Sequence, residues 1–451
     1  MKPGLLPLLN GLRPYAEPLQ ISPYLPQSPG VVRQRWALRP EIRAQRRATS
    51  ESSHPLAFWA SLGVTAAFLY WRLFAMFAQL PATKKQGSAG LKIYHHVGEA
   101  LLRGKIPYLD FFIEYPPGSL LVFVPPALFS SNRVDYTTLF AMEMALVAVA
   151  ALILMALTAR RLWGPWAYAI PTLTFTAAAL LLHNLILARY DPVVTLTLAL
   201  SALCVVLGGR YVLLAYASLG LGAAAKLVPA LATLPLATLR RGAARGYATF
   251  FGVLALFFAL PLLFAREGLI KSFSYQADRG LQVESLGASV LLKLGWVRRT
   301  TFDYGAIEVR GRGVEFASSL SLPLTALLLL LTALMMYREY RRGRLGVEHY
   351  PRYAAALILA YILGSRVLSP QYMLWLLPLV PLVGKRFVKI GISAVFLAAC
   401  GTTRLMLIHY QDLVFLRFPG PDLLLARNLL LVLLWALLLF VLERGSDRQP
   451  P

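Results

Sequence analysis

Long apolar runs separated by short polar segments recur along this chain. A helix of about 20 apolar residues spans the roughly 30 Å hydrocarbon core of a bilayer and satisfies its own backbone hydrogen bonds. The pattern therefore predicts an all-α polytopic membrane protein with about 12 transmembrane or half-membrane helices. The predicted crossings are 57–80, 136–158, 165–184, 192–207, 247–265, 316–337, 353–364, 372–384, 388–408 and 422–442.

Two apolar runs do not fit a single crossing. The run 120–129 covers only about 15 Å as a helix and contains two adjacent prolines, so a re-entrant or interfacial piece is predicted. The run 211–239 is apolar apart from Lys226, yet both of its ends are basic. A single crossing cannot keep both ends on one side, so two short helices that meet near Lys226 are predicted.

Two segments on the outer side are too long to be simple connectors, 81–117 and 266–315. Within the first, Leu91, Tyr94 and Val97 share one face of a helix whose opposite face is polar. This spacing predicts an amphipathic helix that lies in the membrane interface.

Composition and charge agree with a membrane protein. Hydrophobic residues make up 57% of the 451 and charged residues 15%, and the net charge is +24. Lys and Arg gather in short loops on one side of the predicted path, which is the positive-inside pattern, so nucleic acid is not the expected partner. This bias places both termini in the cytoplasm. The resulting divisions are a basic, mostly disordered tail at 1–56, a membrane domain at 57–443 and a short tail at 444–451.

Charged side chains at the outer ends of the predicted helices are the candidates for chemistry, because charges near membrane depth are costly. Each has a structural alternative: solvated loop acids, an Arg189–Asp191 ion pair at a helix junction, a Lys226 that reaches the cytoplasmic interface, or an interfacial Arg366. The candidates are Asp110, Glu114, Arg189, Asp191, Lys226, Arg279, Gln282, Glu284, Arg366 and Gln371.

Taken together, these groups favour transfer chemistry on a lipid phosphate at the outer face. Arg and Lys donate charge-assisted hydrogen bonds to phosphate, and a carboxylate can take a proton from a hydroxyl. Interfacial and re-entrant helices suit a lipid-borne substrate. The histidines have no convincing ligand spacing, and Cys204 and Cys400 lie in apolar runs, so no metal site and no cofactor are predicted.

The string YHHVGEALLRGKIPYLDFFIEYPPGSLLVFVPP resembles the first external loop of polyprenyl-phosphate-dependent glycosyltransferases of the C-type superfold, particularly glycosyltransferase family 87. The later strings ARYDPVVTLTLAL, GLGAAAKLVPAL, RGLQVES and SRVLSPQYMLWLLPL fit in the same order, and the resemblance covers about 60–420. It implies a multi-pass enzyme of the cell membrane. This enzyme would move a sugar, mannose, from a polyprenyl-phosphate donor to a hydroxyl of a lipid or cell-envelope glycan.

The resemblance also implies roles for particular residues. Glu114 and Asp110 match the acids around the YPP segment, Asp191 matches the acid of the next outer loop, and Lys226 and Arg366 match cations that face the phosphate. The other residues that it places in substrate binding are Tyr94, Tyr115, Arg189, Tyr190, Arg279, Gln282, Glu284 and Gln371. One position departs from the family: the acid expected four residues before Tyr94 is Gly90 here.

Two alternatives from other classes stay open. A lipid or sugar transporter would show paired repeats and midplane polar sites on broken helices. This chain has one broken hairpin and outer-end polar groups, which favours the enzyme. A non-catalytic accessory member of the family is the other alternative, because of Gly90.

Overall fold

Helices account for most of the computed structural model, which describes residues 55–80, 89–240 and 242–440. Six helices in these ranges are long and apolar enough to cross a membrane. They are α3 (Pro55–Ala78), α7 (Arg133–Trp163), α13 (Ala243–Phe264), α16 (Val314–Arg341), α18 (Arg386–Ile408) and α20 (Gly420–Phe440). The predicted multi-pass helical architecture is confirmed, whereas the helix count of about 12 and the cytoplasmic termini stay predictions. The predicted tails 1–56 and 444–451 lie outside the described residues, except for Pro55 and Leu56, which begin α3.

Shorter elements complete the bundle. Four apolar helices stand among the long ones: α8 (Ala169–Leu181), α10 (Asp191–Leu207), α11 (Tyr211–Ala225) and α17 (Tyr350–Gly364). The remaining elements are α5 (Ala89–Leu102), η1 (Pro117–Ser119), α6 (Leu120–Leu128), α9 (His183–Ala188), η2 (Val228–Ala232), α12 (Thr233–Leu239), α14 (Arg266–Ala277), α15 (Leu286–Lys293), η3 (Val347–His349), η4 (Pro370–Leu376), η5 (Val380–Leu382) and α19 (Tyr410–Val414).

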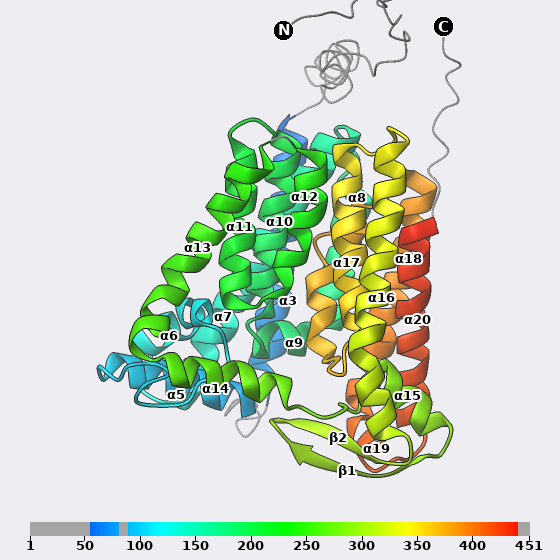
Figure 1. The fold of residues 1–451 in the computed structure, drawn as a ribbon. Helices are drawn as coiled ribbons and strands as arrows, with labels where there is room; N and C mark the ends of the chain where they lie inside the picture. Colours follow the sequence, from blue (N-terminus) through cyan, green and yellow to red (C-terminus); the bar gives the residue numbers. More distant parts are fainter. Residues whose placement is uncertain (1–54, 81–88, 241, 441–451) are drawn as a thin grey trace, which may run out of the picture. The chain divides into compact units, whose positions relative to one another are not determined.

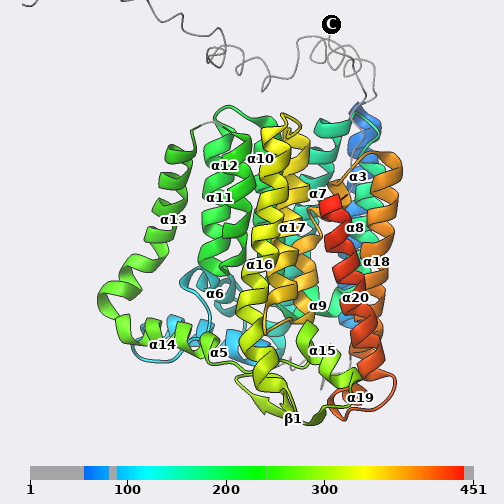
Figure 2. The same ribbon diagram turned by 45° about the vertical axis from the view of Figure 1, so that its right-hand side comes forward.

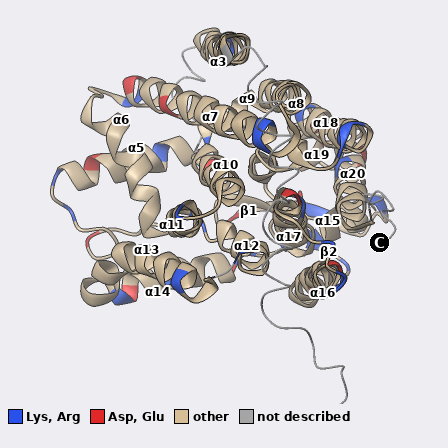
Figure 3. Ribbon diagram, turned by 90° about the horizontal axis from the view of Figure 1, so that it is seen from above, with Lys and Arg blue, Asp and Glu red and all other residues tan. Residues whose placement is uncertain are grey.

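The long helices stand side by side, and α5, α6, α14, α15 and α19 gather at one end of them (Figure 1). We call this the loop end of the bundle. α13 stands beside α11 at the edge and turns into α14, which lies across the loop end (Figure 2). Seen along the bundle, most of the ribbon is uncharged, with scattered segments of Lys, Arg, Asp or Glu (Figure 3). This distribution matches the costs of placing charge in lipid.

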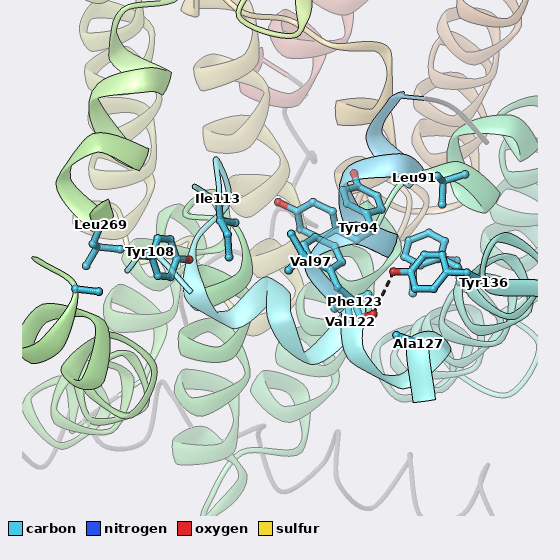
Figure 4. Packing of buried hydrophobic residues seen from close by; sticks show 14 residues of the cluster. Leu91, Tyr94, Val97, Tyr108, Ile113, Val122, Phe123, Ala127, Tyr136 and Leu269 are labelled. Carbon is cyan, nitrogen blue, oxygen red and sulfur yellow. Dashed lines mark hydrogen bonds between the residues drawn. The ribbon is translucent and has the colours of Figure 1, made fainter. Parts of the chain in front are cut away.

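The predicted amphipathic helix is α5. Its residues Leu91, Tyr94 and Val97 are buried, and Lys92 is exposed. The buried face packs on α6, the predicted short piece with Pro125 and Pro126, in the cluster drawn in Figure 4. The two helices approach closely, since a Cβ on Gly98 would lie only 2.6 Å from the Phe123 carbonyl oxygen.

The break predicted near Lys226 is present. α11 ends at Ala225, Lys226 is extended with φ −162° and ψ 118°, and η2 begins with a proline in its first turn. Proline is tolerated there because the first N–H groups of a helix have no partner within it. The predicted pair of short helices therefore surrounds Lys226, with α12 completing the second.

The segment 266–315, predicted to be an outer loop, holds more structure than a loop. Besides α14 and α15 it contains a hairpin of β1 (Val297–Asp303) and β2 (Ala306–Gly311), the one exception to the all-α prediction in the described ranges. The two turn residues, Tyr304 and Gly305, have φ of +49° and +69°. Positive φ at both central residues is the pattern of a type I′ turn, whose twist matches that of paired strands.

Candidate active site

A buried ion pair forms the centre of the site. Asp191, the first residue of α10, is 1% exposed, and its Oδ1 accepts hydrogen bonds from Lys226 Nζ at 2.8 Å and Trp375 Nε1 at 2.7 Å. Asp191 thus pairs with Lys226, not with Arg189, and Lys226 is turned inward with its side chain 19% exposed. Because an ammonium has three donors, Lys226 can also donate to a second anion.

Three aromatic rings surround this ammonium. Lys226 Nζ lies 5.1 Å from the ring centroids of Tyr190 and Trp375 and 5.2 Å from that of Tyr372. Rings at this distance attract a cation through their negative faces. They fix the ammonium beside Asp191 and shield it from lipid.

The guanidinium of Arg189 occupies the space next to Gly90. A Cβ built on Gly90 would lie 2.4 Å from Arg189 Nη1 and 3.4 Å from the Tyr94 hydroxyl oxygen. The guanidinium therefore lies beside that hydroxyl, and burial raises the pKa of Tyr94. Where the resemblance expects an acid, this chain therefore has a half-buried cation beside a tyrosine.

The two acids of the first outer loop differ in their surroundings. Asp110 is exposed, and its Oδ2 accepts a hydrogen bond from the Ile106 N–H at 2.6 Å, so it stabilises a turn. Glu114 is half-buried, and its carboxylate lies near the hydroxyls of Tyr115 and Tyr275. Burial raises the pKa of Tyr115 well above its usual value, so this hydroxyl keeps its proton. Glu114 is thus the first-loop acid that is held beside the buried tyrosines.

Tyrosines link Glu114 to the ion pair. The rings of Tyr115 and Tyr190 meet edge to face with centroids 5.5 Å apart, and Tyr94 contacts both. Tyr190 in turn lies against the Lys226 ammonium. The site therefore extends continuously from Asp191 and Lys226 to Glu114.

Two of the predicted binding residues hold segments at the loop end together. Arg366 Nη1 donates to the carbonyl oxygens of Ala277 at 3.3 Å and Arg279 at 3.1 Å. Gln282 Nε2 donates to Ser369 Oγ at 3.2 Å. These bonds join the segment after α14 to the segment after α17. Arg366 and Gln282 therefore position neighbouring backbone.

Glu284 lies in a second buried polar cluster. Its Oε1 accepts a hydrogen bond from the Tyr410 hydroxyl at 2.7 Å, and its carbonyl oxygen accepts one from Arg427 Nη2 at 2.8 Å. Burial raises the pKa of Glu284, and the Tyr410 hydrogen bond opposes this shift. Arg279 is half-buried. Gln371 is half-buried beside the rings of η4.

Sequence reasoning missed four side chains of these clusters: Tyr372, Trp375, Tyr410 and Arg427. Tyr372 and Trp375 lie in one of the strings on which the resemblance rests, but they were assigned to the predicted apolar crossing 372–384. The signal that could have found them is the polar Ser-Pro-Gln segment at 369–371, which is followed by irregular 3₁₀ turns in place of a membrane helix. In the described ranges no group of three or more His, Cys, Asp or Glu side chains is placed to hold a metal ion.

The described ranges also contain an apolar groove. It has a volume of about 490 Å³ and lies against α13 and α14. Its first lining residue, Leu227, follows Lys226 in the chain. The other lining residues are Phe251, Leu254, Ala255, Phe258, Leu262, Leu269, Ile270 and Phe273.

Comparison with known proteins gives one family match. The model of glycosyltransferase family 87 matches residues 112–370, more than half of the chain. No curated protein matches the sequence.

Two solved structures resemble the chain. The crystal structure of ArnT from Cupriavidus metallidurans bound to undecaprenyl phosphate has a TM-score of 0.48 and 13% identity, and the match covers 86% of this chain and 77% of that one. The same protein in the apo state has a TM-score of 0.43 and 12% identity, with 78% and 72% covered. Similarity at these values determines neither the fold nor the ligand of this chain.

Proposed function

Since this chain belongs to glycosyltransferase family 87, as the sequence strings predicted, we propose that it transfers mannose from a polyprenyl-phosphate donor to a hydroxyl of a lipid or cell-envelope glycan at the outer face of the cell membrane. Membership of the family identifies the chain as a glycosyltransferase. The six long apolar helices of the described residues identify it as a multi-pass membrane protein. The sugar, the donor lipid, the acceptor and the membrane are parts of the proposal.

The observation that carries the proposal is the buried pair of Lys226 and Asp191, which is followed in the chain by a residue that lines an apolar groove. The Lys226 ammonium is fixed by Asp191 and three rings, and Leu227, the next residue, lines the groove. A polyprenyl phosphate has the matching order of parts, a charged phosphate followed by an apolar chain. Lys226 is proposed to donate to the phosphate while the chain lies along α13 and α14.

The proposed reaction is a direct displacement. The acceptor oxygen forms a bond to the anomeric carbon, its proton passes to the Glu114 carboxylate, and the bond to the phosphate oxygen breaks. The lipid phosphate leaves with the electron pair, and the ammonium of Lys226 balances its charge. Because Gly90 cannot supply a base, Glu114 is the first-loop acid assigned to this role. One displacement inverts the configuration at the anomeric carbon.

The experiment uses purified protein in lipid, radiolabelled polyprenyl-phosphate mannose and an extract of membrane lipids and envelope glycans. Glu114→Gln is expected to lower transfer at least about 100-fold, because removal of a general base typically costs 10²–10⁴. Asp110→Asn is the matched control, because Asp110 is an exposed acid of the same loop.

Transfer that survives Glu114→Gln would reject Glu114 as the base. Donor that binds without any transfer by the intact protein would favour the non-catalytic accessory member. Labelled donor that crosses the bilayer unchanged would favour the transporter.

A further inference from the structure

Three aromatic rings form a row near Glu114. Phe112 belongs to the first outer loop, Tyr275 to α14 and Tyr304 to the turn of the hairpin. The ring centroids of Phe112 and Tyr275 are 5.4 Å apart, and those of Tyr275 and Tyr304 are 5.1 Å apart. Phe112 is 44% exposed and Tyr304 40%, so this row, which we call the aromatic platform, faces outward.

The platform borders the candidate base. Burial and the nearby Glu114 carboxylate both raise the pKa of Tyr275, so its hydroxyl lies close to that carboxylate. A Cβ on Gly305 would lie 3.7 Å from that hydroxyl oxygen and 3.9 Å from Glu114 Oε2, so the hairpin turn borders the same carboxylate. Three elements that are distant in sequence therefore converge on Glu114 and leave ring surface above it.

The conformation of the turn indicates a functional role for the Tyr304 ring. A two-residue turn with φ of +49° and +69° favours Asn or Gly at its first position. A bulky residue in this left-handed conformation is strained, and such strain collects at functional sites. A ring that only anchored the hairpin in the membrane interface could occupy an unstrained strand position. Phe302, two residues earlier and 66% exposed, occupies such a position.

We propose that the aromatic platform binds a hexose ring of the acceptor, so that this protein glycosylates a carbohydrate hydroxyl instead of a simple lipid alcohol. The inference rests on the proposed transfer reaction and deepens it. A sugar ring has an apolar C–H face that suits the aromatic faces and a polar edge that suits charged neighbours. Such neighbours are present: Lys271 Nζ lies 5.8 Å from the Phe112 centroid, and Arg310 pairs with Asp303 at 2.9 Å beside the turn. A simple lipid alcohol would find apolar surface in the bilayer and would not need this mixed surface.

The test measures sugar binding apart from catalysis. Full-length protein in nanodiscs is mixed with neutral oligosaccharides of mannose, glucose and galactose, and saturation transfer from protein aromatic protons to sugar protons is recorded by NMR. The variants are Tyr304→Asn, which keeps a residue suited to the turn, and Phe112→Ser. Phe302→Ser is the control, because it removes an exposed ring from the same hairpin.

Binding of at least one sugar by the intact protein is expected, with affinity reduced about 10-fold or more in Tyr304→Asn and Phe112→Ser and unchanged in Phe302→Ser. In the transfer assay the same two variants should raise the acceptor KM and leave the donor KM unchanged. Equal binding in all variants, or none by the intact protein, would overturn the platform and assign the rings to the membrane interface. A failure of the transfer assay alone would reject the proposed reaction, while the NMR result would still decide whether the platform binds sugar.

Discussion

Gly90 and Glu114 offer a direct test of where the base is located. An aspartate at position 90 would point toward Arg189 Nη1, because a Cβ there already lies 2.4 Å from this flexible group. Gly90→Asp alone is expected to pair with Arg189. In the Glu114→Gln background it should restore transfer by about 10-fold or more, because it returns one carboxylate to the site. Gly90→Ala in the same background is the control, and equal rates in the two double variants would contradict the idea that the site accepts a base at either position.

The pair of Asp191 and Lys226 gives a second prediction at this scale. Lys226→Met leaves a carboxylate without its cation in a site where it is 1% exposed, and loss of one partner of a buried pair costs about 3–5 kcal/mol. Adding Asp191→Asn should recover part of this loss, since no buried charge is left unpaired. Thermal unfolding in detergent measures both effects. A double variant less stable than Lys226→Met would show that the carboxylate has other partners that matter more.

At the scale of elements, the first outer loop and the broken hairpin must approach closely. A Cβ on Gly118 would lie 2.5 Å from the Ala224 carbonyl carbon and 2.7 Å from the Ala225 nitrogen, which are backbone atoms just before Lys226. Gly118→Ala must therefore push the two elements apart, with a cost of about 1–3 kcal/mol in stability and a clear loss of transfer.

Gly252→Ala in α13 is the matched control, because a Cβ there meets nothing within 4 Å. Alanine should stabilise this helix by about 0.5–1 kcal/mol. Unfolding temperatures and transfer rates of the two variants separate a steric effect from a general sensitivity to alanine. Equal stability of Gly118→Ala and the intact protein would contradict the close packing.

The elements that could be predicted are those with a strong pattern of apolar and charged residues. α5 was predictable because its apolar residues repeat at helical spacing, and the break at Lys226 because one charge interrupts a run with two basic ends. The hairpin was not predicted. Its strands carry Arg298, Arg299 and Arg310 among the β-branched residues, and the turn uses Tyr-Gly in place of the usual Asn-Gly. The irregular η4 was mistaken for a crossing because its composition is apolar.

At the scale of the whole molecule, the site is assembled from parts that no local pattern connects. Asp191 begins a helix, Lys226 interrupts a hairpin, Trp375 lies in a 3₁₀ segment and Glu114 in the first outer loop. The sequence indicated most of these residues one by one, because charge is rare in apolar surroundings. It did not indicate that Asp191 pairs with Lys226 instead of Arg189. That choice depends on the long-range packing of α10 against α11 and η4.

The groove along α13 extends the site away from the loop end and leads to the last prediction. Ala255 lines the groove, so Ala255→Phe should fill part of it. If a polyprenyl chain lies there, this variant should raise the KM for a long-chain donor about 10-fold, which corresponds to about 1.4 kcal/mol. It should leave the KM for a donor of two isoprene units nearly unchanged, because a short chain reaches less of the groove. Leu256→Phe is the control, since Leu256 is 74% exposed and is not part of the lining. Equal effects on long and short donors would place the chain elsewhere, and the groove would then be surface covered by membrane lipid.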